Sequence, residues 1–169
     1  RLEFSDKPWH SKEETSKYTM LQKSGKAIRY FWVNEVNSVI TSPCPEKPWT
    51  HLKKGEMVEI EGLAWSGHGT IKGVDISFDG GDNWVEAKLK GLVLPKSWTR
   101  FSYIIKWDGK PMILASRSYD DFGNIQPTID EETSAVGVES VYHRNAIVTW
   151  EITSKGECNN VQIRKHKKA

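Results

Sequence analysis

Cysteine is scarce in this chain, and its scarcity excludes several kinds of site. Only Cys44 and Cys158 occur among the 169 residues, and they form no Cys-x-x-Cys pair. The five histidines are scattered, without the close spacing of zinc-binding motifs. A zinc site is therefore not expected. Cys44 stands in a Pro-Cys-Pro turn, either as an exposed thiol or as the disulfide partner of Cys158 in an oxidising compartment.

Long apolar runs are missing as well. Runs such as Met112 to Ala115 are far shorter than the roughly 20 apolar residues that a membrane helix needs. The chain begins with Arg1, without an initiator Met and without the basic and apolar regions of a secretory signal. We therefore expect no membrane contact, and we interpret the start as an interior cut, from a fragment or a processed product.

An excess of either charge is absent too. The chain has 24 basic and 22 acidic side chains, a net charge of +2, and the two signs are interleaved. This balance argues against nucleic acid as a partner. The basic run from Arg164 to Lys168 is the exception. We interpret it as a solvated tail, with a docking arm for an acidic partner as the alternative.

The stretch from Leu63 to Trp84 is the clearest structural signal in the chain. Apolar and polar residues alternate from Val74 to Phe78, which predicts a strand with one buried face. Asp79-Gly80-Gly81 follows, and glycine accepts the positive φ angles of a tight turn. Together these residues predict a β-hairpin. Its second strand resumes the alternation after Trp84, with three residues facing inward: Val85, Ala87 and Leu89.

Short strand patterns recur along the rest of the chain, and no segment keeps a helical period over ten or more positions. The predicted strands cover residues 35–40, 57–61, 74–78, 84–89, 101–107, 112–117 and 146–152. Such spacing is typical of an antiparallel β-sandwich of immunoglobulin type. The predicted fold class is therefore all-β, with the polar residues 1–34 as an extended N-terminal arm.

Tryptophan is the compositional outlier, with eight copies. Trp84, Trp107 and Trp150 fall in phase with strand faces, which predicts that they fill the core. Trp65 and Trp98 are predicted to pack beside turns. The alternative is a stand-alone module that binds glycans on exposed, coplanar tryptophans.

Reactive groups form no recognisable site in the sequence. Asp79, Asp82, Asp120 and Asp121 are candidate calcium ligands, but they lie in separate predicted turns, where Asp bonds its own backbone. A Gly-rich phosphate loop, a Ser-His-Asp ordering and an activated cysteine are all missing. We therefore predict no catalytic, cofactor-binding or metal-binding residue in this chain.

Several motifs of the chain occur together in one known domain. They are Ala64-Trp65-Ser66-Gly67-His68-Gly69, Val74 to Ser77, Asp79-Gly80-Gly81 and Trp84. In this combination they resemble the C-terminal dimerisation domain of the sulfite oxidase family of molybdenum oxidoreductases. We take six residues as the structural signature of this resemblance: Trp65, Gly67, Asp79, Gly80, Gly81 and Trp84.

Further motifs extend the resemblance along the chain. Val36 to Thr41 resembles the first strand of that domain, and Asn124 to Pro127 resembles its late turn. Tyr142-His143-Arg144, together with Trp150, resembles its last strand. The resemblance therefore covers nearly the whole chain.

Within the family, three motifs are most similar to the sulfane dehydrogenase subunit of the thiosulfate-oxidising (Sox) system: Lys7-Pro8-Trp9, Glu14 to Tyr18, and Leu94-Pro95-Lys96. This similarity implies a parent enzyme that oxidises a reduced sulfur compound at a molybdopterin-bound metal in the bacterial periplasm. It also implies a c-type cytochrome and a sulfur-carrier protein as partners.

The resemblance implies a domain organisation too. Residues 1–34 would be the end of the preceding molybdenum-cofactor domain and its linker, and residues 35–169 the immunoglobulin-like dimerisation domain with its basic tail. The chain would hold no cofactor, because the cysteine that ligates molybdenum belongs to the missing domain, and neither Cys44 nor Cys158 matches its context. It would be inactive alone, pairing two subunits as a homodimer and bordering the substrate entrance.

His143 and Arg144 are the candidate residues at that entrance. Family members commonly carry an arginine at the position of Val136, where sulfite oxidases use it to attract their anionic substrate. Its absence favours a sulfane-type substrate over sulfite, and Arg144 could compensate for the missing cation. Thr70 and Gly73 likewise stand where related sequences often have arginines.

Overall fold

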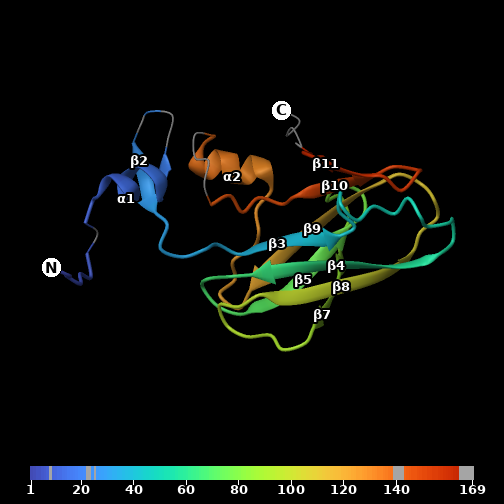
Figure 1. The fold of residues 1–169 in the computed structure, drawn as a ribbon, viewed down its shortest axis with the longest axis horizontal. Coiled ribbons are helices and arrows are strands. Elements are labelled where there is room, and N and C mark those ends of the chain that lie inside the picture. Colours follow the sequence, from blue (N-terminus) through green and yellow to red (C-terminus); the bar gives the residue numbers. More distant parts are fainter. Residues whose placement is uncertain (8, 22–23, 25, 139–142, 164–169) are drawn as a thin grey trace.

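Two antiparallel sheets form the body of the protein. The computed structural model describes residues 1–7, 9–21, 24, 26–138 and 143–163. The sheets pack face to face, a short helix lies beside them, and an N-terminal arm projects from one end (Figure 1). The predicted all-β, immunoglobulin-like sandwich is confirmed. The basic run from Arg164 to Lys168 lies outside the described residues.

The first sheet holds four strands. They are β3 (Asn37–Ser42), β4 (Met57–Trp65), β7 (Lys88–Lys90) and β8 (Thr99–Lys106). Their order across the sheet is β3-β4-β8-β7. Along β4 the inward residues Ile60, Gly62 and Ala64 are buried and alternate with outward residues, as a two-residue period requires.

The second sheet holds five strands. They are β5 (Ile71–Ser77), β6 (Val85–Glu86), β9 (Met112–Asp120), β10 (Thr149–Ile152) and β11 (Cys158–Val161). Their order is β11-β10-β9-β5-β6. The sequence analysis did not predict β11, because half of this strand is asparagine, a residue type that is uncommon in strands. Assigning His143, Arg144 and Trp150 to the last strand was therefore wrong, because Trp150 lies in β10 and His143 and Arg144 lie in no strand. Tyr142 of the same motif lies outside the described residues.

The predicted hairpin is present but short. In it, β5 pairs with β6, with Asp75 opposite Glu86 and Ile76 opposite Val85. The chain then crosses to the other sheet at the buried Ala87, and β7 pairs with β8. The single strand predicted for residues 84–89 is thus two strands in different sheets. Val85, predicted to face inward, is exposed.

Phe101 occupies the centre of the core. Its ring is fully buried and covers Gly62 on the neighbouring strand β4, where a Cβ atom would collide with it. Trp107 is buried as predicted, against Trp49 with ring centroids 5.9 Å apart. Trp84 does not belong to the core cluster of the described residues, so that prediction was wrong.

The surface tryptophans do not form the flat platform that a glycan-binding module would need. The ring centroids of Trp65 and Trp98 lie 6.3 Å apart, but the ring planes are tilted by 44°. Trp49 is buried rather than exposed. The glycan alternative therefore has no support, although Trp98 is 70% exposed instead of packed.

The predicted turn aspartates Asp79 and Asp120 accept hydrogen bonds from the residues of their own loops. Asp79 accepts hydrogen bonds from the backbone N–H and side chain of Asn83 and from the Ser77 hydroxyl, and these bonds lower its pKa. Burial raises the pKa of Asp120, but hydrogen bonds from Asn124 and Ser66 outweigh this effect and lower it. The turn interpretation is confirmed.

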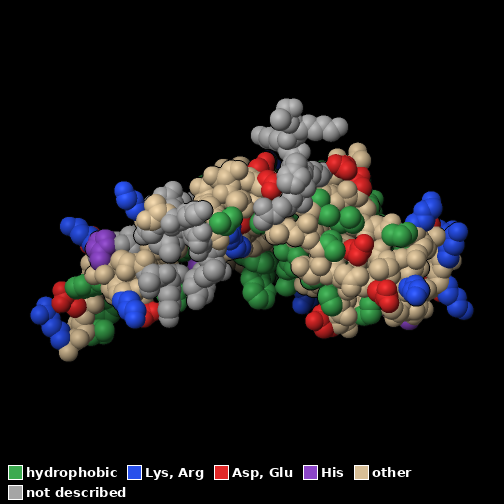
Figure 2. Space-filling view, turned by 90° about the horizontal axis from the view of Figure 1, so that it is seen from above, with side chains coloured by type: hydrophobic (Ala, Val, Ile, Leu, Met, Phe, Trp, Pro, Cys, Tyr) green, Lys and Arg blue, Asp and Glu red, His purple; other side chains and the backbone are tan. Residues whose placement is uncertain are grey.

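The N-terminal arm has more structure than the sequence suggested. It contains α1 (Lys12–Lys17), β1 (Thr19–Leu21) and β2 (Ala27–Tyr30). A capping box between Ser11 and Glu14 starts the helix, and this Ser-x-x-Glu pattern was the sequence signal for it. In the space-filling view the arm and the sandwich lie end to end, and hydrophobic side chains gather on the surface between them (Figure 2).

Both cysteines are free thiols, so the disulfide alternative is not realised in this structure. Cys158 is 6% exposed and belongs to the core cluster. Burial, with smaller contributions from the nearby Cys44 and Glu46, raises the pKa of the Cys158 thiol to about 11. Cys44 is half-buried in the loop after β3.

We expect Cys44 to react with a thiol reagent in the folded chain at pH 8, and Cys158 to resist it. Raising the Cys158 pKa from 9.0 to about 11 lowers its thiolate fraction by about a hundredfold. Thiol titration of the folded and unfolded chain checks this, with Cys44→Ser and Cys158→Ser variants assigning the signal. Equal reaction rates in the folded state would contradict the buried placement of Cys158.

Candidate functional site

The second helix was missed by the sequence analysis, and it carries the buried acid of the candidate site. It is α2 (Ile129–Val136), and a capping box between Thr128 and Glu131 starts it. The Thr-x-x-Glu pattern directly after Gln126-Pro127 was the available signal. Glu132 points from this helix toward the sandwich and is only 4% exposed.

Two donors from one segment hold the Glu132 carboxylate. Arg144 Nη1 donates to Glu132 Oε2 at 2.8 Å, and the backbone N–H of Asn145 donates to Glu132 Oε1 at 2.8 Å. A buried carboxylate needs such partners, because its desolvation is otherwise costly. The ion pair therefore fixes α2 against the segment that carries the predicted entrance residues.

A polar network on the opposite side fixes the same segment. Asn37 Nδ2 donates to the Arg144 carbonyl at 3.4 Å, and Asn145 Nδ2 donates to the Val36 carbonyl at 3.1 Å. The Asn37 side chain is oriented in turn by the amide of Gln126, whose Nε2 donates to Asn37 Oδ1 at 2.8 Å. The start of β3 thus sets the position of Arg144.

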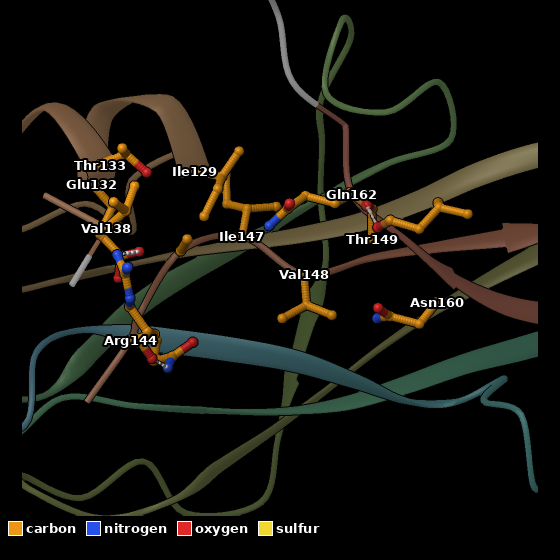
Figure 3. A pocket seen from close by; sticks show the side chains of 13 residues that line it. Ile129, Glu132, Thr133, Val138, Arg144, Ile147, Val148, Thr149, Asn160 and Gln162 are labelled. Carbon is orange, nitrogen blue, oxygen red and sulfur yellow. Dashed lines mark hydrogen bonds and ion pairs between the residues drawn. The ribbon is translucent and has the colours of Figure 1, made fainter. Parts of the chain in front are cut away.

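A cavity of about 420 Å³ opens beside this ion pair. Its walls come from α2, from residues 144–149 and from β11, so it lies at the edge of the five-stranded sheet. Figure 3 shows the side chains of Ile129, Ile147 and Val148 along it, with Asn160 and Gln162 on the β11 side. The lining is apolar with amides at the rim, and Glu132 neutralises its one cation, Arg144.

The candidate residue His143 points away from this cavity toward the arm. Its ring centroid lies 4.2 Å from that of Phe31 and 6.0 Å from that of Tyr18. Its backbone φ is +59°, which is unfavourable for a residue with a side chain. The structure thus separates the two predicted entrance residues: His143 contacts the arm, and Arg144 lies at the cavity.

Four of the signature residues have structural roles in the sandwich, as the following contacts show. Gly80 and Gly81 have φ angles of +73° and +94°. At Gly67 a Cβ atom would lie 2.8 Å from the Asn34 carbonyl oxygen, so only glycine admits the incoming chain. Trp84 packs under Arg117, whose Cζ is 4.4 Å from the ring centroid.

The three positions at which the sequence departs from the family pattern, Thr70, Gly73 and Val136, have different surroundings. A side chain at Gly73 would collide with the Tyr119 hydroxyl, so an arginine at this position needs a different neighbour. Thr70 donates its backbone N–H to Asp121 in a turn. Val136 ends α2 and is half-buried. Arg144 lies on a separate segment and is paired with Glu132.

The described residues do not fit a molybdenum site. They contain no group of three or more His, Cys, Asp or Glu side chains that could hold a metal ion. The Cys158 thiol is buried in the core with a raised pKa, which disfavours the thiolate that ligation requires.

No helix in the described part of the chain is long and apolar enough to cross a membrane.

We expect Arg144→Met to lower the free energy of unfolding by about 3 kcal/mol, because it leaves the buried Glu132 carboxylate without its cation. Adding Glu132→Gln removes that charge and should restore more than half of the loss. Denaturant unfolding of the four chains of this double-mutant cycle measures the coupling. Lys110→Met is the control, since the Lys110–Asp108 pair is exposed and worth less than about 1 kcal/mol. A loss no larger than the control's would contradict the role of this pair.

Two curated proteins are similar in sequence to part of this chain. Sulfite oxidase of Rattus norvegicus, a mitochondrial protein, is 34% identical over 99 residues, and sulfite oxidase of Gallus gallus is 31% identical over 98 residues. Each alignment covers 54% of this chain, but only 17% and 20% of the respective relatives. The chain thus spans a small part of these enzymes.

A solved structure matches much more of the chain. The sulfane dehydrogenase SoxCD from Paracoccus pantotrophus superposes with a TM-score of 0.88 and 48% sequence identity, over 94% of this chain and 40% of that chain. The model of the Mo-co oxidoreductase dimerisation domain family matches residues 29–150. This chain therefore belongs to the Mo-co oxidoreductase dimerisation domain family.

Proposed function

We propose that this chain is the homodimerisation domain of a molybdenum-dependent, sulfane-dehydrogenase-like enzyme. The observation that carries the proposal is the 48% identity to the SoxCD chain over 94% of this chain. At that identity, both the fold and the arrangement of its surfaces are expected to be shared. A sandwich face can pair with its own copy, since a two-fold interface needs only one self-complementary patch.

The proposal includes a domain boundary near residue 34. Residues 1–34 would belong to the cofactor domain and its linker, and residues 35–169 to the dimerisation domain. In support, α1, β1 and β2 form a unit outside the sandwich (Figure 1). The chain enters the sandwich at Asn34, whose carbonyl accepts a hydrogen bond from Gly67 N–H at 2.8 Å.

The whole enzyme would oxidise a reduced sulfur compound at its molybdenum cofactor in the bacterial periplasm. A c-type cytochrome and a sulfur-carrier protein would be its partners. The cofactor would be held by the domain that precedes this one, and the present chain would contribute His143 and Arg144 near the substrate entrance. The contact of His143 with Phe31 and Tyr18 of the arm supports this placement.

Mass measurement tests the dimer. We expect sedimentation equilibrium of the 169-residue chain to give twice the monomer mass of 19.3 kDa at micromolar concentration, with dissociation on dilution. The reason is that a dimerisation domain carries its interface on its own surface. A mass of one chain at every concentration would contradict the proposal.

Substrate kinetics of the whole enzyme test the entrance. We expect Arg144→Met to raise the KM for thiosulfate several-fold at low salt and to leave kcat nearly unchanged, because Arg144 would attract the anion without touching the reacting atoms. Arg144→Lys should retain most of the wild-type KM. Lys155→Met, in the turn between β10 and β11, is the matched control. If both methionine variants gave the same KM, Arg144 would have no place at the entrance.

A further inference from the structure

Both cysteines of this chain lie at the same end of the sandwich, although they stand far apart in the sequence. Cys44 lies in the loop after β3, and Cys158 is the first residue of β11, which forms a hairpin with β10 (Figure 1). In the register of that hairpin, Cys158 pairs directly with Ile152, the last residue of β10. Cys158 and Ile152 both belong to the buried core cluster. The Cys158 thiol therefore points between the two sheets.

Two hydrogen bonds fix the direction of β3 relative to β10. Asn37 starts β3 and donates to the carbonyl of Arg144. Further along, the Ile40 carbonyl accepts a hydrogen bond from Trp150 Nε1 at 3.0 Å. The two segments therefore advance in the same direction, and the end of β3 comes level with the end of β10. Cys44 follows β3 after one further residue, so it arrives close to the residue pair that ends β10 and begins β11.

The loop after β3 is held across the turn of this hairpin. Cys44 and Lys47 exchange two backbone hydrogen bonds, of 3.4 and 2.9 Å, which form a tight turn. The Trp49 N–H then donates to the Gly156 carbonyl at 2.7 Å, in the turn between β10 and β11. Burial is the main cause of the raised pKa of Cys158, and the charge on Cys44 is the next, an effect that acts only over a short separation. The two thiols are therefore neighbours.

The two thiols differ in access and reactivity. Cys44 is half-buried and partly accessible from solution, whereas Cys158 is 6% exposed. Burial also raises the pKa of Cys158 to about 11, which keeps this thiol protonated at neutral pH. Thiol–disulfide exchange starts with a thiolate that can reach the sulfur it attacks. A disulfide reagent from solution therefore meets Cys44 first, and Cys158 reacts only with a sulfur atom that already lies beside it.

We propose that Cys44 and Cys158 are a redox pair that closes to a disulfide when the chain meets a low-molecular-weight disulfide such as oxidised glutathione. The Cys44 thiolate attacks one sulfur of the oxidant, and the other sulfur leaves as the first thiol. Cys158 then attacks the Cys44 sulfur of the mixed disulfide and releases the second thiol. The two cysteines together lose two protons and two electrons, which the two thiols of the reduced oxidant carry away.

The disulfide would join the two sheets at their edges. The strand β3, which leads to Cys44, is an edge strand of the four-stranded sheet, and β11 is an edge strand of the five-stranded sheet. An edge strand is hydrogen-bonded on one side only, so it opens more readily than the strands inside a sheet. Asn160 and Val161 of β11 line the cavity beside Arg144. The bond would therefore hold this wall of the cavity in place, and an oxidising compartment would preserve it.

Exchange with oxidised glutathione tests the pair. We expect the folded, reduced chain to lose two hydrogens and to yield, in an unreduced digest, one peptide pair linked through Cys44 and Cys158, both measured by mass spectrometry. In Cys158→Ala the reaction should stop with one glutathione on Cys44, because no second thiol displaces it. Cys44→Ser should stay unmodified, since Cys158 is not reached from solution. The linked peptide of the unaltered chain decides the pairing even where a variant does not fold.

Thermal unfolding measures the effect of the bond. We expect the oxidised chain to unfold about 10 °C above the reduced chain, because the bond closes most of the sandwich into one loop and so restricts the unfolded state. Dithiothreitol should abolish the difference. Cys44→Ser, treated in the same way, is the control and should show no shift.

Three results would overturn the pairing: a wild-type chain that keeps glutathione on Cys44, one that is joined to a second chain through Cys44, or one that does not react. An oxidised chain that is no more stable than the reduced one would overturn the formation of this bond within the native fold. Each of these results would leave the proposed function intact, since none of them concerns the cofactor, the dimer or the substrate entrance.

Discussion

The amide of Gln126 connects the two sheets and the candidate site. Gln126 is 1% exposed, and its Oε1 accepts from the Ser38 hydroxyl of β3 at 2.6 Å and from the Ser118 N–H of β9 at 3.3 Å. Its Nε2 binds Asn37, which in turn holds the Arg144 carbonyl. One buried side chain thus joins both sheets and sets the segment that carries Arg144. A buried amide whose donors and acceptors are all satisfied has few alternative arrangements. Gln126 therefore helps to fix the position of one sheet relative to the other.

The ion pair of Glu132 limits what Arg144 can do. A cation neutralised by a buried carboxylate attracts anions less than a free arginine does, so any effect on substrate is expected to be an attraction of modest size. The same pair explains why α2 can lie where it does. A short helix with a buried carboxylate is stable only if donors meet that acid, and residues 144 and 145 provide them. The same guanidinium group thus stabilises α2 and, in the proposed function, would attract the substrate.

The parts of the fold that the sequence predicted are those with a local period. Alternation between Val74 and Phe78 gave β5, and the glycines at 80 and 81 gave the turn, because both signals lie within a few residues. The strand split at Ala87 was not predictable in this way, since the alternation continues unbroken while the chain changes sheets. Of the site, Arg144 was found by its resemblance to relatives. Glu132 was missed because its burial depends on Arg144, a partner distant in the sequence, whereas the Thr128 to Glu131 capping box was a local signal that went unused.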